Sequence, residues 1–306
     1  MKDIISVKQL QDKKLLSQLF ERANYYAASS PINYPKPLLS LTIASVFFEP
    51  STRTRLSFET AAQNLGAQLL TVENAGEYSS VKKGESLEDT IRTIQAYADG
   101  IIIRHPEVGS ADQAAKVADV PIINAGDGGG EHPTQALLDL YSIEKAKGKI
   151  DGLKIALVGD LEHSRTQHSL LTLLSIFDVE LYLVSPKSIG LPDNLRSYLK
   201  RHSVKFKELY DWQDIIPEVD VLYINRIQKE RFAFPEEYQN LKDSFRLTTD
   251  IVKRMKKNAI ILDPLPRVNE IDPAVDDDPR AKYFEQVKNG LYVRMALLEH
   301  IFAPKA

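Results

Sequence analysis

Residues 41–66 have the sequence LTIASVFFEPSTRTRLSFETAAQNLG, which passes from an apolar segment through a polar one to an amphipathic one. Leu41–Phe48 is rich in β-branched and aromatic residues, which predicts a buried strand. A helix is predicted to continue over Ser57–Leu65 after the polar segment Ser51–Thr54, and Gly66 stops it at a C′ position. The stretch therefore predicts a strand, a polar loop and a helix in succession.

The same alternation continues along the chain. Short apolar segments predict further strands at Gln68–Val72, Gly100–Ile103, Pro121–Asn124, Lys154–Val158, Glu180–Val184, Val221–Ile224 and Ala259–Leu262. Helical spacing predicts a first helix from the cap Ser6 to about Ala28, and others at Leu87–Tyr97, Pro133–Lys147 and Tyr283–Phe302. Residues 74–85 are polar and lack a period, which predicts a loop. Strands that alternate with helices indicate parallel sheets covered on both faces, an α/β fold.

A length of 306 residues is typical of about two domains. Gly148 ends one predicted helix, and Asp151 and Gly152 begin a new set of strands, so the main boundary is placed there. The last helix, Tyr283–Phe302, is expected to pack back on the first half. We expect one domain of residues 1–147 with 285–306 and another of residues 148–284, each a parallel sheet flanked by helices.

Composition excludes several classes of function. Lysine and arginine total 39 against 42 aspartate and glutamate residues, a net charge of −3, which provides no field that gathers nucleic acid or anionic membranes. The absence of cysteine excludes disulfides, zinc–thiolate sites and thiol nucleophiles. Charged residues interrupt the first segment, unlike a signal peptide, and no apolar run reaches the roughly 18 residues of a membrane span. We expect a soluble cytoplasmic protein that binds neither nucleic acid nor membrane.

The sharpest local signal is Ser51-Thr52-Arg53-Thr54, between a predicted strand and a predicted helix. The N–H groups at a helix start and the positive end of its dipole favour an anion, and an arginine suits a phosphate dianion. The alternative is that the hydroxyl side chains only cap the helix and the arginine is solvated. No G-x-x-x-x-G-K-[ST] motif occurs, so the segment is not a P-loop.

Arg104 and His132 occupy comparable positions. Arg104 follows a buried apolar segment, and ligands of open α/β sheets bind beyond the carboxyl ends of strands. His132 ends a glycine-rich stretch and precedes Pro133, the predicted first helical residue, with Gln135 one turn further on. A helix N-terminus favours a neutral imidazole that can donate to a polarised carbonyl. A solvent-facing arginine and a structural histidine are the alternatives, and the glycine spacing argues against a dinucleotide site.

The second half repeats this arrangement. Arg165 lies near a predicted helix start and suits a carboxylate. Arg226 and Gln228 are expected to extend the preceding strand and, with its period of two, to point the same way. The charged residues 229–231 are interpreted as solvated surface. Residues 263–267, DPLPR, form a proline-stiffened strand exit whose backbone carbonyls can accept from a ligand amide.

These candidates are cations or neutral donors, and none is a carboxylate or a nucleophile. The chain has no H-E-x-x-H motif, no calcium loop and no G-x-S-x-G motif. Such a set suits a reaction whose substrates bring both the nucleophile and the leaving group, while the protein supplies positioning and charge stabilisation.

Four ordered motifs resemble those of the transcarbamoylase family. They are FEPSTRTRLSFE at 48–59, RHP at 104–106, HPTQ at 132–135 and PLPR at 264–267. KKGE at 82–85, Arg165-Thr166 and residues 226–231 resemble the aspartate branch, and the acceptor motifs of the ornithine branch are missing. Two arginines and a lysine suit a dicarboxylate, whereas a diamine would require acidic partners.

The resemblance implies two domains, one for carbamoyl phosphate and one for aspartate, with no metal or organic cofactor. The implied ligands of the substrate phosphate are Ser51, Thr52, Arg53 and Thr54. The implied catalytic residues around the carbonyl oxygen are Thr54, Arg104 and His132. The implied ligands of the carbamoyl NH2 group are Gln135 and the backbone carbonyls of Leu265 and Pro266. The implied ligands of L-aspartate are Lys83, Arg165, Arg226 and Gln228.

The implied reaction gives N-carbamoyl-L-aspartate and phosphate in pyrimidine synthesis. The loop with Ser79 and Lys83 would reach into a neighbouring subunit's site, which implies a homotrimer, either alone or in a larger assembly with regulatory chains. A transcarbamoylase for another amine, such as ornithine, and an inactive family member that binds phosphometabolites are the alternatives. The chain departs from the family at Asp263, where histidine is usual, which places a negative charge near the anion site.

Overall fold

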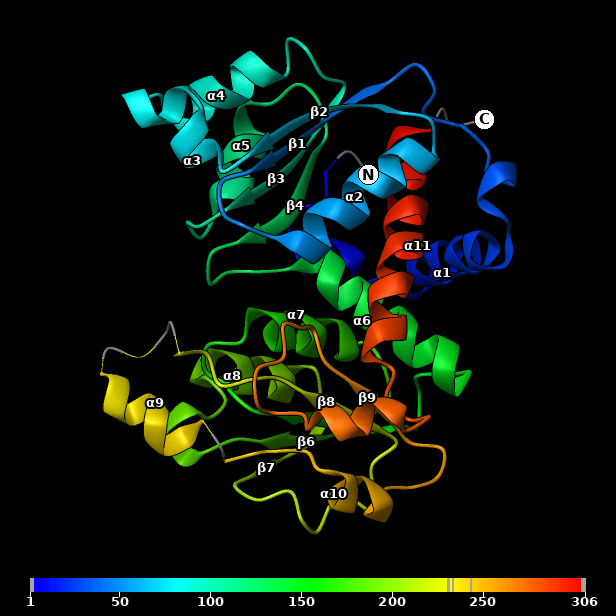
Figure 1. Ribbon diagram of the computed structural model, residues 1–306, viewed down its shortest axis with the longest axis vertical. Helices are drawn as coiled ribbons and strands as arrows, with labels where there is room; N and C mark the ends of the chain where they lie inside the picture. The colour runs from blue at the N-terminus through cyan, green and yellow to red at the C-terminus, as the bar shows by residue number, and fades with distance from the viewer. Residues whose placement is uncertain (1–2, 230–231, 233, 243, 304–306) are drawn as a thin grey trace. The chain divides into compact units, whose positions relative to one another are not determined.

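The computed structural model describes residues 3–229, 232, 234–242 and 244–303, which form two compact units. Unit 1 consists of residues 1–138 and 287–306, and unit 2 of residues 139–286. Each unit contains one parallel sheet with helices on both of its faces (Figure 1). The expectation of an α/β fold with two parallel sheets is confirmed.

Unit 1 has four strands in the order β2-β1-β3-β4. The strands are β1 (Thr42–Phe47), β2 (Gln68–Glu73), β3 (Gly100–His105) and β4 (Ile122–Asp127). Its α-helices are α1 (Lys13–Ala28), α2 (Thr52–Asn64), α3 (Ala75–Tyr78), α4 (Leu87–Ile94) and α5 (Ser110–Val117). Two further helices contribute residues to both units, α6 (Pro133–Lys147) and α11 (Tyr283–Phe302). The 3-10 helices are η1 (Val7–Leu10), η2 (Pro31–Asn33) and η3 (Ser80–Lys83).

Both faces of this sheet are covered, which explains why its central strands are almost continuously apolar. Val46, Ile101 and Ile103 belong to a buried cluster with residues of α4 and α5 on one face. Helices α2 and α11 lie on the other face (Figure 1). Gly100 shows how close α11 comes, because a Cβ atom there would lie 2.3 Å from the ring of Phe302.

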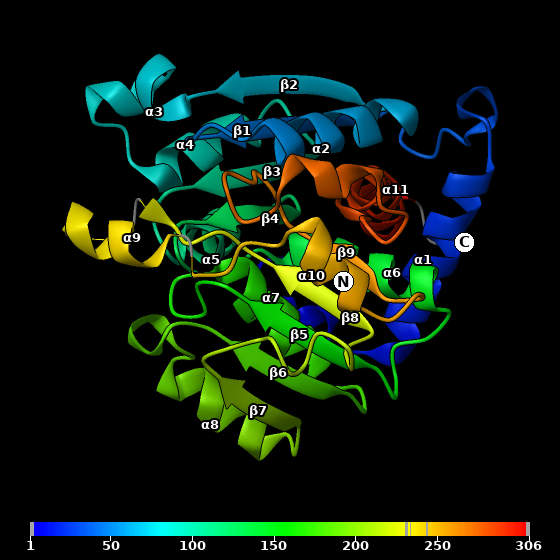
Figure 2. The same cartoon turned by 60° about the horizontal axis from the view of Figure 1, so that its bottom comes forward.

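Unit 2 has five strands in the order β7-β6-β5-β8-β9 (Figure 2). The strands are β5 (Lys154–Val158), β6 (Glu180–Val184), β7 (Lys205–Leu209), β8 (Val221–Ile224) and β9 (Ile260–Leu262). The helices are α7 (Arg165–Leu174), α8 (Asp193–Arg201), α9 (Pro235–Leu241) and α10 (Thr249–Arg254), with 3-10 helices η4 (Lys187–Ile189) and η6 (Pro273–Asp277). Residues of β5, β6 and β8 form one buried cluster with Trp212 and Phe245 and with Val252, which belongs to α10.

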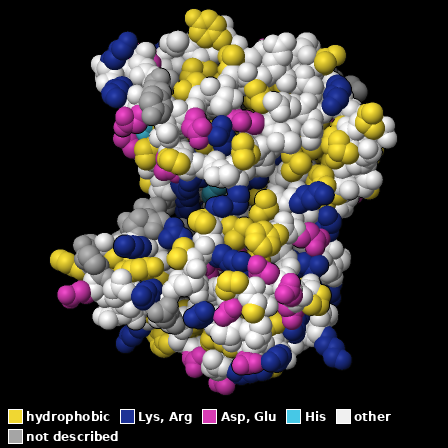
Figure 3. Space-filling model, in the orientation of Figure 1, with side chains coloured by type: hydrophobic (Ala, Val, Ile, Leu, Met, Phe, Trp, Pro, Cys, Tyr) yellow, Lys and Arg dark blue, Asp and Glu magenta, His cyan; other side chains and the backbone are white. Residues whose placement is uncertain are grey.

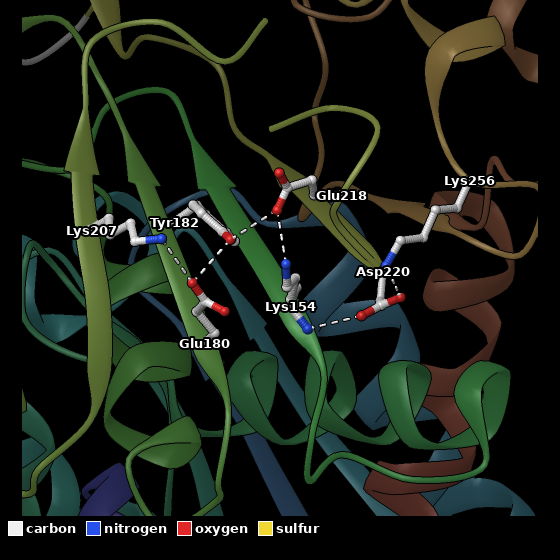
Figure 4. A network of polar contacts seen from close by, with 7 residues as sticks. All are labelled: Lys154, Glu180, Tyr182, Lys207, Glu218, Asp220 and Lys256. Carbon is white, nitrogen blue, oxygen red and sulfur yellow. Dashed lines mark hydrogen bonds and ion pairs between the residues drawn. The ribbon is translucent and has the colours of Figure 1, made fainter. Parts of the chain in front are cut away.

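A network of polar contacts connects neighbouring strands of unit 2 (Figure 4). Its members are Lys154, Glu180, Tyr182, Lys207, Glu218, Asp220 and Lys256. Lys154 Nζ lies 2.8 Å from Glu218, and Lys207 Nζ lies 3.1 Å from Glu180. Because solvent screens the exposed lysine–glutamate pairs, these two ion pairs contribute little to stability.

Several predicted elements are confirmed with their bounds, namely β5, β6, α6 and α11. Strand β7 is missing from the prediction, because its sequence KFKEL places charged residues on an exposed edge strand. The loop predicted over residues 74–85 is wrong in part, since α3 and η3 lie within it. Ser79 Oγ accepts from the Val81 N–H at 3.2 Å, and Gly84 ends η3 with a φ of 94°.

The single first helix predicted from Ser6 is two elements. Ser6 caps only η1, accepting from the Lys8 N–H. Asp12 then caps α1 by accepting from the N–H groups of Lys14 and Leu15. On the face that Figure 3 shows, acidic and basic side chains are interspersed over both units. Among the residues described, no helix combines the length and apolar character that crossing a membrane would require.

Candidate active site

Most of the predicted site residues of unit 1 lie at or after the ends of three neighbouring strands. Ser51–Thr54 come after β1, Arg104 lies near the end of β3, and His132 comes after β4. Strands β1, β3 and β4 are parallel and adjacent, so their carboxyl ends lie at one edge of the sheet. The fold therefore assembles these donors at a single edge.

Helix α2 begins at Thr52, five residues before the predicted start at Ser57. Ser51 occupies the N-cap position, but its side chain makes no capping hydrogen bond, so the capping alternative is wrong for Ser51. Ser57 Oγ donates to the Arg53 carbonyl at 2.6 Å and accepts from Arg294 Nη1 at 2.9 Å, which ties the first turn of α2 to α11. The first turn of a helix presents N–H groups to an anion.

Arg104 is largely buried, with 13% of its side chain exposed, and pairs with Glu49 at 2.5 Å. Its Nη1 also donates to the Ala125 carbonyl at 3.3 Å. Burial lowers the pKa of the Arg104 guanidinium, and the Glu49 carboxylate opposes that change. An arginine remains charged despite such a shift. The solvent-facing alternative for Arg104 is therefore wrong, and the side chain is a cation held in place.

Thr54 and His132 meet at this edge although 78 residues separate them. Thr54 Oγ1 lies 3.4 Å from His132 Nε2, and both residues are buried. The His132 carbonyl accepts from the N–H groups of Gln135 and Ala136, which begins α6 at Pro133 as predicted. Gln135 is buried as well. A hydroxyl, an imidazole and an amide thus lie around the start of α6.

The glycine-rich loop before His132 is cross-linked to β3. Strand β4 continues to Asp127, beyond the predicted end at Asn124. The Gly128 N–H donates to the His105 carbonyl at 2.7 Å. Asp127 then accepts from the Glu131 N–H at 2.7 Å through Oδ1. These bonds hold the backbone that precedes His132 against β3.

The predicted residues of unit 2 also follow three neighbouring strands. Arg165 comes after β5, Arg226 and Gln228 after β8, and the Leu265-Pro266 segment after β9. Strands β5, β8 and β9 are parallel and adjacent. Their carboxyl ends therefore bring the three segments to one edge of this sheet.

Two side-chain contacts join the segments after β5 and β8. Asn225 Nδ2 donates to Ser164 Oγ at 2.5 Å. The Asp160 carboxylate accepts from the His163 N–H at 3.0 Å and from the Gln228 N–H at 3.4 Å. The start of α7, which carries Arg165, is thus linked directly to the segment that carries Gln228.

The predicted extension of β8 to Gln228 is wrong, because β8 ends at Ile224. Its pairing with β5 ends at Val158, and Gly159 then adopts a φ of 120°, where a Cβ atom would lie 2.0 Å from the Asn225 carbonyl oxygen. Burial still alternates beyond the strand, and Arg226 and Gln228 are both half-buried. Glu230 and Arg231 lie outside the described residues.

Ser79 and Lys83 lie in the loop after the edge strand β2. Ser79 Oγ donates to the Ala75 carbonyl at 2.5 Å, within the same loop. Lys83 is exposed in η3. Ser79 and Lys83 thus follow a different strand from the one that precedes or carries each of the other donors of unit 1.

Sequence reasoning missed the carboxylates that hold the donors in place, which are Glu49, Asp127 and Asp160. Each lies within five residues of a predicted site residue, and this closeness in sequence could have indicated that these carboxylates support the site. Among the residues described, no three histidine, aspartate or glutamate side chains are grouped so that they could hold a metal ion.

Residues 2–145 match the family model described as "Aspartate/ornithine carbamoyltransferase, carbamoyl-P binding domain". Residues 151–301 match the model described as "Aspartate/ornithine carbamoyltransferase, Asp/Orn binding domain". The chain belongs to the aspartate/ornithine carbamoyltransferase family. A curated member of this family, the aspartate carbamoyltransferase catalytic subunit of Methanocaldococcus jannaschii, is 49% identical over 305 residues, which cover 98% of each chain.

Solved structures of the family agree with this assignment. The catalytic subunit of M. jannaschii aspartate transcarbamoylase superposes with a TM-score of 0.91 at 48% identity, covering 98% of each chain. Aspartate transcarbamoylase of Trypanosoma cruzi in complex with carbamoyl phosphate and aspartate superposes with a TM-score of 0.91 at 36% identity, covering 97% of this chain and 95% of that one. The family resemblance and its two-domain fold are confirmed.

Proposed function

We propose that this chain transfers the carbamoyl group of carbamoyl phosphate to the amine of L-aspartate, giving N-carbamoyl-L-aspartate and phosphate. The observation that carries the proposal is the gathering of donor side chains at the carboxyl edges of both sheets, in a chain 49% identical to an aspartate carbamoyltransferase catalytic subunit. The T. cruzi relative with both substrates bound adds support. The reaction requires no cofactor, because the substrates bring the nucleophile and the leaving group.

In this proposal unit 1 binds carbamoyl phosphate. The N–H groups at the start of α2, with Ser51, Thr52, Arg53 and Thr54, hold the phosphate dianion, which also meets the positive end of the helix dipole. Thr54, Arg104 and His132 surround the carbonyl oxygen. The support is the 3.4 Å approach of Thr54 to His132 and the buried position of the Arg104 cation.

Most of the proposed ligands of L-aspartate belong to unit 2. Arg165, Arg226 and Gln228 hold the two carboxylates, together with Lys83, and a guanidinium matches a carboxylate with two parallel hydrogen bonds. Gln135 and the carbonyls of Leu265 and Pro266 accept from the NH2 group. We retain the expected division of the chain for these roles, residues 1–147 with 285–306 for carbamoyl phosphate and 148–284 for aspartate.

The chemical step follows from these positions. The aspartate amine attacks the carbonyl carbon, a C–N bond forms, and negative charge develops on the carbonyl oxygen. Fixed donors at that oxygen each contribute about 2.7–4 kcal/mol to transition-state stabilisation. The C–O bond to phosphate then breaks, and phosphate leaves with the bonding electron pair while the amine loses a proton.

Measuring carbamoyl transfer to L-aspartate and to L-ornithine tests the acceptor. We expect turnover with aspartate only, because Arg165 and Arg226 are cations that match carboxylates and would repel a diamine. Preference for ornithine would overturn the assignment of these arginines. Binding of carbamoyl phosphate without turnover would instead identify an inactive family member.

We further propose a homotrimer in which Ser79 and Lys83 complete the site of a neighbouring subunit. The exposed position of Lys83 in η3 is consistent with such a role. Mixing inactive Lys83→Ala and Arg53→Ala chains should restore part of the activity, since some mixed sites would be intact. No recovery in verified mixed trimers would refute sharing.

The assembly and the location of the protein extend this proposal. We expect the reaction to serve pyrimidine synthesis in the cytoplasm. Sizing the purified protein, both alone and from its native source, would distinguish a free trimer from a larger assembly with regulatory chains.

A further inference from the structure

Asp263 lies directly after β9 and is 2% exposed. The proposed reaction gives its carboxylate no part, although the next residues carry the carbonyls proposed to accept from the carbamoyl NH2 group. A buried acid beside a site of donors is costly unless hydrogen bonds stabilise it. The bonds that this acid makes therefore indicate what it does.

The Asp263 carboxylate binds the backbone of the next turn. The Leu265 N–H donates to Asp263 Oδ1 at 2.5 Å. Leu265 has a φ of 55°, in the left-handed region that residues with a side chain adopt at an energetic cost. A short hydrogen bond donated to a carboxylate oxygen is a means of holding such a conformation. Asp263 thus holds the peptide whose carbonyls the proposed function uses.

A series of buried hydrogen bonds fixes Asp263 in turn. Its N–H donates to Gln286 Oε1 at 3.1 Å, and Gln286 Nε2 donates to Asp139 Oδ1 at 2.6 Å. The Tyr223 hydroxyl donates to Asp139 Oδ2 at 2.9 Å. Tyr223 pairs with Leu262 between β8 and β9, so the series starts and ends on neighbouring strands. The donors and acceptors are matched throughout, which leaves the Asp263 backbone little freedom to move.

The chain contains a second X-Pro-X segment with the same bond. At the end of β3, His105 Nδ1 accepts from the Glu107 N–H at 3.1 Å across Pro106. Asp263 Oδ1 accepts from Leu265 across Pro264 in the same way. A histidine and an aspartate can therefore provide the same acceptor in this setting. Asp263, where the resemblance led us to expect histidine, makes at this position the bond that His105 makes after β3.

We propose that Asp263 is a positioning residue that holds the Leu265 and Pro266 carbonyls for the carbamoyl NH2 group. It thereby makes the site selective for carbamoyl phosphate over acyl phosphates that lack this group. This inference rests on the proposed function.

The test compares carbamoyl phosphate with acetyl phosphate, in which a methyl group replaces the NH2 group. In Asp263→Ala we expect the KM for carbamoyl phosphate to rise about 10- to 100-fold, the effect of losing a hydrogen bond to a charged group. The Ki of acetyl phosphate should change less than about twofold, because acetyl phosphate has no NH2 group. Asp263→Asn and Asp263→His keep a neutral acceptor, so the KM for carbamoyl phosphate should rise less than in Asp263→Ala, while the Ki of acetyl phosphate stays close to wild type. These two variants keep the test decisive if Asp263→Ala does not fold.

The matched control is Asp272→Ala. Asp272 also accepts an N–H two residues on, from Ala274 at 3.0 Å, but it lies at the start of η6 and outside the proposed site. Its loss should lower thermal stability without changing either constant. If both constants rise in parallel in Asp263→Ala, or if neither changes, this inference is overturned and the proposed function is unaffected. A wild-type protein that does not carbamoylate aspartate would overturn the proposed function and this inference with it.

Discussion

Replacing Arg104 by alanine should lower the kcat of carbamoyl transfer by about 10²- to 10³-fold, the usual effect of removing one fixed donor from a developing oxyanion. The structure supports a large value, since only 13% of the Arg104 side chain is exposed and Glu49 holds it at 2.5 Å. A donor held in this way needs no reorganisation when charge develops on the substrate. The loss corresponds to about 2.7–4 kcal/mol of transition-state stabilisation.

The fold should survive this change. Arg104→Ala leaves the Glu49 carboxylate without this guanidinium, but 28% of the Glu49 side chain is exposed, so water can solvate it. We expect a loss of about 1–3 kcal/mol in the free energy of unfolding, because the Ala125 carbonyl also loses the Arg104 donor. Arg104→Lys keeps the charge but loses the forked donor geometry, and its kcat should lie between those of wild type and Arg104→Ala.

The assay follows N-carbamoyl-L-aspartate at saturating carbamoyl phosphate and aspartate, together with thermal unfolding. Arg92→Ala is the control, because Arg92 is an exposed arginine of the same unit that pairs with Asp89 at 3.1 Å on α4. It should leave kcat unchanged. A folded Arg104→Ala variant with the kcat of wild type would refute the assignment of Arg104 as a donor to the carbonyl oxygen.

Two further predictions concern stability. Burial lowers the pKa of His168, whose Nε2 lies 2.7 Å from the Leu161 carbonyl oxygen. The neutral His168 side chain therefore contributes fully to stability above the usual histidine pKa of about 6.5, and this contribution is lost as pH falls below that value. His168→Gln should therefore weaken the decrease in the free energy of unfolding between about pH 7.5 and 5, and an unchanged pH dependence would contradict this. Gly128→Ala should cost about 2–4 kcal/mol in chemical denaturation, because φ is 53° and the new Cβ atom would lie 2.1 Å from the Pro106 carbonyl oxygen. Gly84→Ala, with a φ of 94° and no atom within 4 Å, is the control and should cost only about 1–2 kcal/mol.

Local sequence patterns predicted the elements whose burial follows a simple period. The apolar runs of β5 and β6 and the spacing of α6 and α11 are confirmed at both ends. Strand β7 was missed, because an edge strand with alternating charges has no apolar run. The start of α2 at Thr52 was also missed, since its polar first turn resembles a loop in sequence.

The residue types and their order along the chain were sufficient to predict two α/β units, a donor-only set of site residues and the family. They could not predict which donors meet, because the strand orders β2-β1-β3-β4 and β7-β6-β5-β8-β9 are not the order of the chain. The approach of Thr54 to His132 and the bond between Asp160 and Gln228 depend on that order. Periodicity reports which face of an element is buried, whereas contacts between distant residues depend on how the whole unit packs.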